Sequence, residues 1–225
     1  MKKLTILFGF IICLPNFLSA QIMPFGLDGI TVTDLRINNN VLYAATVDSG
    51  VFRRELSGTG WECLGLKEKW ITSVYPYPFD TGTYSVTVGV YHKLRPGDST
   101  YLFSLSDSGW IADDNGMEYS DFLYGISSID GYVYNGGSHF MFAGGDWRIY
   151  KRSNLNWNSS GRSGAYVVKI SNDGTVWIGG VANLLNPFIA KSTDKGDTWM
   201  YGDYEYWGDG EVSSLAFHPT DSNVL

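Results

Sequence analysis

The stretch that decides the expected fold is Lys191-Ser192-Thr193-Asp194-Lys195-Gly196-Asp197-Thr198-Trp199, which fits the pattern S-x-D-x-G-x-T-W at every specified position. Asp194 is placed to accept hydrogen bonds from backbone N–H groups of its own loop, and Gly196 tolerates a positive φ that a Cβ would oppose. Thr198 then begins a returning strand, and Trp199 offers a large flat surface for burial. We therefore expect a tight hairpin whose structural residues are Ser192, Asp194, Gly196, Thr198 and Trp199.

The same turn followed by tryptophan occurs three times earlier in the chain, in less complete form. The weaker copies are Ser57-Gly58-Thr59-Gly60-Trp61, Ser106-Asp107-Ser108-Gly109-Trp110 and Ser153-Asn154-Leu155-Asn156-Trp157. The four tryptophans are 49, 47 and 42 residues apart. A period of about 40–50 residues with several short strands in each unit is typical of propeller blades.

Each unit also opens with apolar residues at the same offsets. The opening sets are Val32, Leu35 and Ile37 in the first unit, Ile71, Val74 and Pro76 in the second, and Ala165, Val168 and Ile170 in the fourth. The third unit is less regular, and residues 124–129, 132–134 and 139–143 are all candidate strands. Near the C-terminus the same offsets return in Val212, Leu215 and Phe217.

These repeats predict an all-β chain that forms a β-propeller of four-stranded antiparallel blades. We expect four blades, at about residues 28–66, 67–113, 120–160 and 163–203, and the start of a fifth at 211–225. Because each blade must cover its neighbour, this arrangement is an incomplete ring, and the sequence is expected to be a fragment of a protein with more blades. The alternative is a closed ring of four blades with an extra strand.

The repeats resemble those of the BNR or Asp-box propellers, a group that includes sortilin-type domains, photosystem II assembly-factor-like proteins, sialidases and xyloglucanases. The segment from Ser192 to Trp199 carries most of the resemblance, and residues 212–221 are similar to the blade-opening segment of sortilin-type and xyloglucanase repeats. Both features belong to the scaffold, so the resemblance implies a fold and leaves the activity open.

Residues 1–20 have the layout of an export signal. Lys2-Lys3 precede an apolar run over residues 4–18, and Ser19-Ala20 follow it. A membrane anchor is the alternative, but Pro15-Asn16 interrupt the run, which is shorter than the ~20 residues of a spanning helix. We therefore expect a secreted, periplasmic or cell-surface protein, most consistent with a bacterial source, that keeps no membrane span after cleavage.

Charge and cysteine content narrow the chemistry further. Cleavage would change the formal net charge from −7 to −9, and such an acidic surface repels phosphate backbones, so no nucleic-acid partner is expected. Cys63 would be the remaining thiol, and its alternation with Trp61 predicts a buried and inert side chain. No metal or cofactor is expected, because His92, His139 and His218 stand apart from one another.

Two classes of function remain open from the residues alone. The first is a non-catalytic scaffold that binds a protein or glycan ligand, and the second is a fragment of a glycoside hydrolase. A sialidase is disfavoured, since residues 51–55 do not provide its early arginine motif and Arg36 is the only clear arginine on a blade-opening strand. A xyloglucanase-like enzyme needs two carboxylates ~5–9 Å apart, and Asp34 is the only acid that we nominate.

The candidate ligand-binding residues lie on a loop rich in aromatic and acidic side chains. Residues 201–211 include Tyr204, Tyr206 and Trp207, which could stack on sugar rings or contact a basic partner. The alternative is that this loop packs on the next blade. The sequence identifies neither the ligand nor the oligomeric state.

Overall fold

The computed structural model describes residues 26–78, 85–92, 100–118, 125–134, 139–153, 155–161, 164–182, 186–202 and 209–218, and every structural statement below refers to them. These residues form strands and turns, and no helix occurs among them. The strands are β1 (Val32–Asn38), β2 (Val41–Thr46), β3 (Val51–Glu55), β4 (Glu62–Gly65), β5 (Trp70–Pro76), β6 (Val86–Tyr91), β7 (Leu102–Ser106), β8 (Gly109–Ala112), β9 (Ile126–Val133), β10 (His139–Gly145), β11 (Ile149–Ser153), β12 (Asn156–Gly161), β13 (Gly164–Ile170), β14 (Val176–Ala182), β15 (Asn186–Ser192) and β16 (Met200–Tyr201).

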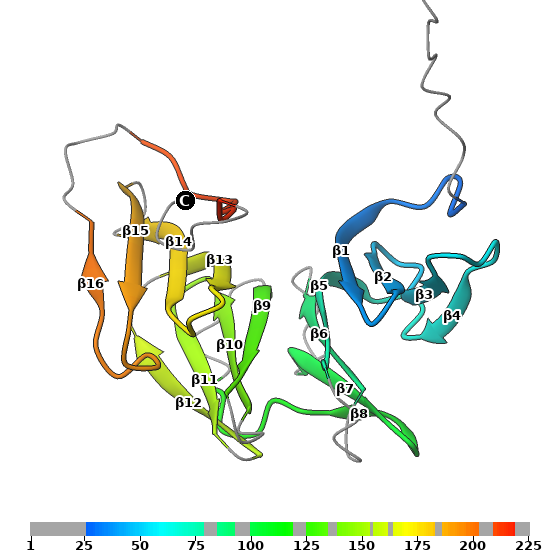
Figure 1. Cartoon of the computed structure of the whole chain (residues 1–225), viewed down its shortest axis with the longest axis horizontal. Coiled ribbons are helices and arrows are strands. Elements are labelled where there is room, and N and C mark those ends of the chain that lie inside the picture. The colour runs from blue at the N-terminus through cyan, green and yellow to red at the C-terminus, as the bar shows by residue number, and fades with distance from the viewer. Residues whose placement is uncertain are drawn as a thin grey trace, which may run out of the picture.

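The strands form four sheets, each of four antiparallel strands in chain order. Sheet A contains β1–β4, sheet B β5–β8, sheet C β9–β12 and sheet D β13–β16. The first strand of each sheet lies toward the centre of the molecule, and the fourth lies at the periphery (Figure 1). The prediction of an all-β chain of repeated four-stranded sheets is therefore confirmed.

A β-bulge recurs at one place in every sheet. The register between the first and second strands shifts at Val32/Asp34 in sheet A, at Ile71/Ser73 in sheet B, at Gly144/Gly145 opposite Ser128/Ile126 in sheet C, and at Ala165/Val167 in sheet D. The bulge makes Val32, Ile71, Ile126 and Ala165 equivalent positions. It also orders the irregular third unit, in which two of the candidate strands belong to one continuous strand, β9.

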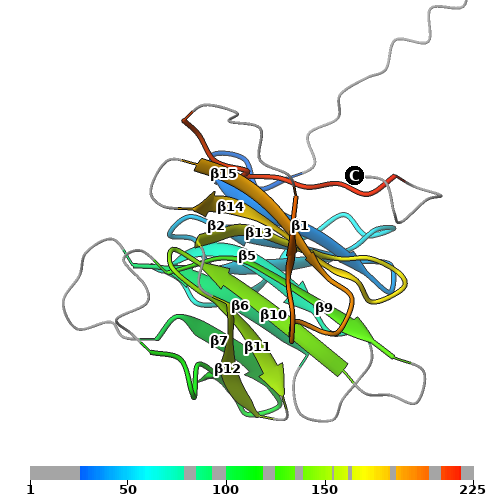
Figure 2. The same ribbon diagram turned by 90° about the vertical axis from the view of Figure 1, so that its left-hand side faces the viewer.

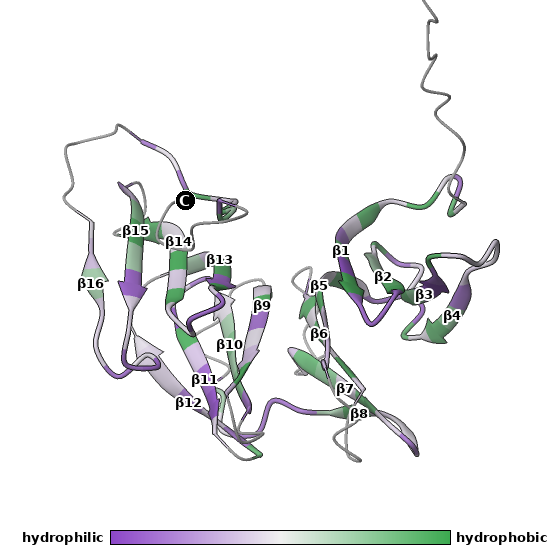
Figure 3. Cartoon of the chain, viewed as in Figure 1, coloured by the Kyte–Doolittle hydropathy of each residue, from purple (hydrophilic) through white to green (hydrophobic). Residues whose placement is uncertain are grey.

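Apolar clusters join each sheet to the next. Ala45 of β2 clusters with Ile71 and Val74 of β5, which links sheets A and B. Met141 of β10 shares a cluster with Ile129 of β9 and with residues of sheet B, and the third cluster links sheets C and D. Hydrophobic stretches accordingly occur on strands of all four sheets (Figure 3). The core is therefore a series of layers between sheets and not one central cluster.

Three tryptophans link sheets B, C and D to the outer edge of the sheet before each of them. The indole Nε1–H groups of Trp110, Trp157 and Trp199 donate to the backbone carbonyls of Leu64, Asp113 and Ser160, each over 2.7 Å. Each hydrogen bond satisfies the indole N–H, so that the aromatic ring can be packed against the neighbouring sheet without leaving a polar group unpaired. The tryptophans of the sequence repeat therefore act between sheets.

The remaining sequence predictions have mixed outcomes. The side chain of Cys63 is exposed, so the prediction of a buried thiol is wrong. Its strand, β4, is the outer strand of sheet A, where the alternation of side chains does not place one face in a core. The expected signal segment, residues 1–20, lies outside the described residues. No described segment is a helix long and apolar enough to span a membrane.

Candidate functional site

The hairpin loop at Ser192 uses its polar side chains internally. Ser192 Oγ donates to Asp194 Oδ1 over 2.7 Å and accepts the Gly196 N–H over 2.7 Å. Thr198 donates to Asp194 twice, from its N–H over 2.9 Å and from its hydroxyl over 2.5 Å. These bonds, led by the Thr198 hydroxyl, lower the pKa of Asp194 to about 2. Gly196 has a φ of 83°, as a turn of this kind requires.

The histidines and acidic side chains of the described residues do not gather into a metal site. Those residues contain no group of three His, Cys, Asp or Glu side chains that could hold a metal ion. His92 Nε2 hydrogen-bonds the Thr100 carbonyl, and His139 Nε2 hydrogen-bonds the Tyr75 hydroxyl. Tyr204, Tyr206 and Trp207 lie outside the described residues, so their role stays a prediction.

The recurrent bulge places four other side chains at one level of the inner strands. Counting from the bulge, Arg36 of β1, Tyr75 of β5, Asp130 of β9 and Lys169 of β13 are equivalent positions. Two cations, one carboxylate and one phenol therefore lie at the same level on the first strands of four different sheets. Two of them form an ion pair, with 3.9 Å between Arg36 Nη1 and Asp130 Oδ1.

Arg36 connects the inner strands of two sheets that are not adjacent. Its Nη2–H donates to the Ile129 carbonyl of sheet C over 3.2 Å, and its Nε–H donates to Asp34 Oδ2 over 3.4 Å. Asp34 Oδ2 also accepts the Val74 N–H of sheet B over 3.0 Å. Asp34, which the sequence nominated as a channel acid, is therefore bound to the backbone of the next sheet.

Asp130 lies deep among the inner strands, and burial raises its pKa from the ordinary aspartate value. The Arg36 guanidinium opposes this rise most strongly, followed by the Ile170 N–H, which donates to Asp130 Oδ2 over 2.9 Å. Burial, together with repulsion from Arg36, lowers the pKa of Lys169. Arg36, Asp130 and Lys169 thus interact with one another where water is largely excluded, and an unpaired charge there would be costly.

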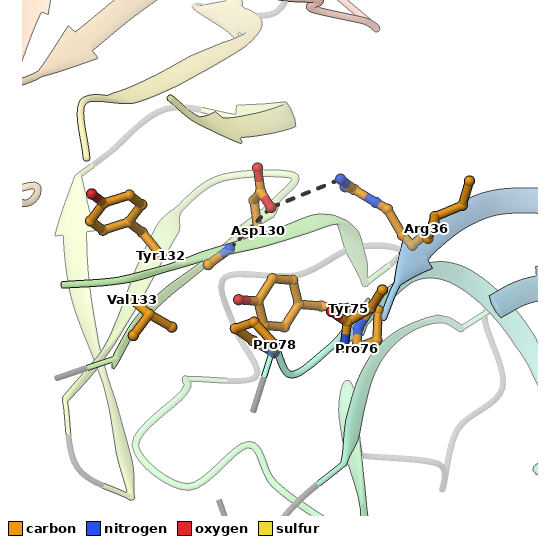
Figure 4. A pocket seen from close by; sticks show the side chains of 10 residues that line it. Arg36, Tyr75, Pro76, Pro78, Asp130, Tyr132 and Val133 are labelled. Atoms are coloured by element: carbon orange, nitrogen blue, oxygen red, sulfur yellow. Dashed lines mark hydrogen bonds and ion pairs between the residues drawn. The ribbon is translucent and has the colours of Figure 1, made fainter. Parts of the chain in front are cut away.

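A pocket of about 310 Å³ lies where the inner strands of sheets A, B and C end. Its wall combines the Arg36–Asp130 pair with rings and apolar side chains; it is lined by Arg36, Ile37, Asn38, Tyr75, Pro76, Pro78, Asp130, Gly131, Tyr132 and Val133. The Arg36 guanidinium reaches across the pocket toward Asp130, with Tyr75 and Pro78 below (Figure 4). The volume is at the lower end of the range of small-ligand sites.

Sequence reasoning found Arg36 and Asp34 but missed Asp130, Tyr75 and Lys169 as their neighbours. Arg36 and Asp130 are far apart in the chain, and the irregular third unit concealed the register of β9. The usable signal was the opening pattern itself, since each of the four residues lies four positions after a bulge-opening residue.

No protein-family model matches the chain, and a search of curated proteins found no match. Among solved structures, an ancestral GH74 enzyme matches with a TM-score of 0.58 and 14% identity, covering 76% of this chain and 25% of the enzyme. The fold is a β-propeller. The chain thus spans about a quarter of that enzyme, and the likeness shows the fold alone.

Two further solved structures match this propeller chain less well. The computationally designed protein Ika8 has a TM-score of 0.42 and 14% identity, with 70% of this chain and 45% of Ika8 covered. The extracellular domain of BT4673 from B. thetaiotaomicron has a TM-score of 0.45 and 16% identity, with 78% and 30% covered.

Proposed function

We propose that this protein is an exported, non-catalytic β-propeller scaffold that recognises a protein or glycan ligand. The observation that carries the proposal is the state of the charged groups around the centre: each carboxylate there is already bonded to backbone N–H groups and to Arg36. Such groups can orient a ligand without reacting with it. The Ser192–Trp199 loop, as the Asp-box of the repeat, has a structural part in this proposal.

The hydrolase alternative requires one carboxylic acid and one carboxylate that face a common cleft. Asp34 and Asp130 are the central carboxylates among the described residues, and Arg36 contacts both, at 3.4 Å and 3.9 Å. The guanidinium offsets one of the two negative charges and lies between the two carboxylates, which an enzyme of this kind would need on either side of its substrate. The arrangement therefore favours recognition over hydrolysis.

The central pocket is suited to recognition because it combines apolar surface with fixed polar groups. Tyr132 and Val133 of β9, Pro76 at the end of β5 and Pro78 after it provide the apolar wall. The aromatic loop with Tyr204, Tyr206 and Trp207 is a second proposed contact surface. Both surfaces suit sugar rings, whose C–H faces pack on aromatic side chains, and a protein side chain of similar shape.

A binding screen and a hydrolysis assay on the purified exported chain test the proposal together. We expect binding on an array of plant and bacterial oligosaccharides, or to a protein captured from the native cell surface, and no release of reducing ends from xyloglucan. Turnover of xyloglucan that is lost in Asp34→Asn and Asp130→Asn would instead establish the hydrolase. Absence of any ligand from both screens would count against recognition.

Variants then distinguish the two proposed surfaces. Replacing Tyr204, Tyr206 and Trp207 together with Ala should reduce affinity at least about tenfold without lowering the thermal midpoint, if the loop contacts ligand. Tyr132→Ala tests the pocket in the same assay, and Leu155→Ala, a change at an exposed turn residue that belongs to neither surface, is the control. A lower thermal midpoint for the triple variant would show that the loop packs on the protein.

A further inference from the structure

A lysine of the Ser192–Trp199 loop rests on two aromatic rings of the neighbouring sheet. Lys195 Nζ lies 4.2 Å from the ring centre of Tyr134, which follows β9, and 4.7 Å from that of Phe140 on β10. The two rings meet at 85°, with 5.1 Å between their centres. The loop that carries Lys195 lies in front of sheet C in Figure 2, beside β9 and β10. Attraction between the ammonium and the rings therefore holds the end of this side chain in one place.

The backbone of Lys195 is held in place by the hydrogen bonds of its own loop. Its φ is 62°, in the left-handed region that glycine and asparagine occupy more readily than lysine. Asp194 keeps the loop in this conformation, because its Oδ1 accepts both the Ser192 hydroxyl over 2.7 Å and the Thr198 N–H over 2.9 Å. The loop and the two rings therefore fix the position of the charge before any ligand binds, which reduces the ordering cost of binding.

The polar ends of Lys195 and Tyr134 are available to a ligand. Lys195 is exposed, and its three N–H donors form no hydrogen bond or ion pair with the part of the chain that the structure describes. The Tyr134 hydroxyl likewise has no hydrogen-bond partner among the described residues. A second lysine beside Phe140, Lys151, lies 5.7 Å from the ring centre and is paired with Asp197 at 3.0 Å. Lys195 thus brings an unpaired positive charge to this aromatic cluster.

Asp173 is an acidic neighbour of this cluster, on the turn between β13 and β14. Its charge contributes, after burial and Tyr132, to raising the pKa of the Tyr134 hydroxyl. Its Oδ1 accepts the Thr175 N–H over 3.0 Å, and it forms no ion pair with Lys195 within the described structure. The Asp173 carboxylate would repel a ligand group with two negative charges, such as a phosphate monoester, more strongly than a group with one. The cluster therefore favours a ligand group with a single negative charge.

The aromatic cluster continues into the central pocket through Tyr132. The Tyr132 and Tyr134 rings meet at 79°, with 4.6 Å between their centres, and Tyr132 also lines the pocket. Arg36, the cation of the pocket wall, already contacts Asp130 at 3.9 Å, so the charges of the pocket lining offset one another. A ligand that fills both places would have an uncharged, partly apolar body beside Tyr132 and a negative group at Lys195.

We propose that Lys195 and Tyr134 form a carboxylate-binding subsite and that the ligand is a polysaccharide that contains uronic acids. A uronate residue has a pyranose ring that can pack on a tyrosine and a carboxylate that accepts hydrogen bonds from the Lys195 ammonium and the Tyr134 hydroxyl. An aspartate or glutamate side chain of a protein has the carboxylate without the ring. The net charge of −7 repels polyanions at a distance, but the ions of a physiological solution screen that repulsion beyond about 8 Å. This inference rests on the proposed recognition function and specifies its ligand.

Binding of uronate oligosaccharides to two charge-matched variants tests the subsite. The probes are oligosaccharides of galacturonic, glucuronic and mannuronic acid, titrated into the purified protein in a calorimeter. Lys195→Gly removes the ammonium and suits the left-handed backbone, so affinity should fall at least about tenfold while the thermal midpoint stays within about 3 °C of the parent. Lys67→Gln, which removes an equal charge from the exposed turn between β4 and β5, should leave affinity within about twofold of the parent. Tyr134→Phe keeps the ring and should weaken binding about threefold or more.

Changes to the ligand separate this inference from the proposed function. Methyl esters of the same oligosaccharides, in which the carboxylates are neutral, should bind the parent at least about tenfold more weakly. Esters that bind as tightly as the acids, or full affinity in Lys195→Gly, would overturn the subsite and leave glycan recognition standing. Oligoglutamate that binds as tightly as the uronates and depends equally on Lys195 would overturn the glycan assignment in favour of an acidic protein. If no uronate binds, the inference is wrong; if neutral glycans and captured proteins also fail to bind, the proposed function is wrong with it.

Discussion

At the scale of single residues, the hairpin at Ser192 is stabilised by bonds that span four positions or fewer. Ser192 is 1% exposed, and its hydroxyl both donates to Asp194 and accepts from Gly196. Removing one partner of a buried pair leaves the other unsatisfied, which costs more than the bond itself contributes. We therefore expect Ser192 to contribute more to stability than the less buried serines of the weaker repeats.

We expect Ser192→Ala to lower the free energy of unfolding by about 1–3 kcal/mol, because the Gly196 N–H loses its acceptor. Ser106→Ala is the comparison, since the Ser106 hydroxyl contacts Ser108 and donates to the Gly109 carbonyl over 2.9 Å; its loss leaves no buried N–H without an acceptor and should cost about 1 kcal/mol or less. Urea unfolding followed by tryptophan fluorescence measures both. Equal effects of the two substitutions would contradict the assigned role.

The partly buried side chain of His139 makes the free energy of unfolding depend on pH. Burial, with a smaller contribution from Arg152, lowers its pKa to about 4. The unfolded chain, with a histidine pKa near 6.5, therefore binds the proton first. We expect the part of the unfolding free energy due to His139 to be complete above about pH 6.5 and to be lost as the pH falls toward 4. His139→Gln should flatten this part of a pH series of urea unfolding curves, and an unchanged slope would be inconsistent with the assignment.

At the scale of strands and sheets, the first two strands of sheet D approach each other closely at their bulge. A Cβ on Gly180 of β14 would lie 1.8 Å from the Gly164 carbonyl oxygen of β13, at the bulge in sheet D. Neither atom belongs to a flexible side chain, so the strands themselves would have to separate. The glycine at position 180 is thus required for the close approach of β13 and β14 at this bulge.

Gly180→Ala is accordingly expected to lower the free energy of unfolding by about 3 kcal/mol or more, since both strands must shift. Gly60→Ala is a suitable comparison, because a Cβ there meets nothing within 4 Å. Thermal unfolding monitored by circular dichroism distinguishes the two. A tolerated Gly180→Ala would mean that β13 and β14 can separate at this point without loss of stability.

At the scale of the whole molecule, a buried ion pair joins sheets B and C. Arg152 of β11 contacts Asp113, which follows β8, at 2.7 Å, and also donates to the Tyr77 hydroxyl over 2.8 Å. Both charged side chains are at most 6% exposed. Ser104 donates a further hydrogen bond to Asp113, so the network spans several strands. Breaking it from one side leaves an unpaired charge between two sheets.

Arg152→Met should lower the free energy of unfolding by about 3–5 kcal/mol, because Asp113 remains buried without its partner. Adding Asp113→Asn should recover part of the loss, which a double-mutant cycle measures. Arg53→Met, which removes an exposed pair with Glu62 at 2.7 Å, should cost ~1 kcal/mol or less. Additive losses for Arg152 and Asp113 would show that the two side chains do not stabilise the sheets together.

Features of this fold that depend on interactions between residues close in the chain can be predicted from the sequence. The loop at Ser192 and the strand pattern around Val32 or Ile71 depend on neighbours a few residues away, so pattern and turn chemistry predict them. The level shared by Arg36 and Asp130 depends on bulges in two sheets, which shift the alternation by one residue. Exposure of Cys63 depends on whether another layer covers its strand.

The sequence by itself therefore determined the class of fold, the period of the repeat and the anchoring tryptophans, because backbone hydrogen bonding and side-chain alternation are local properties. Only the tertiary structure decided that Arg36 joins Asp34 to Asp130 and that Val32 and Leu35 lie open while Ile71 and Val74 are buried. Those outcomes depend on which sheets stand beside one another, and stacking brings together residues that no local interaction connects.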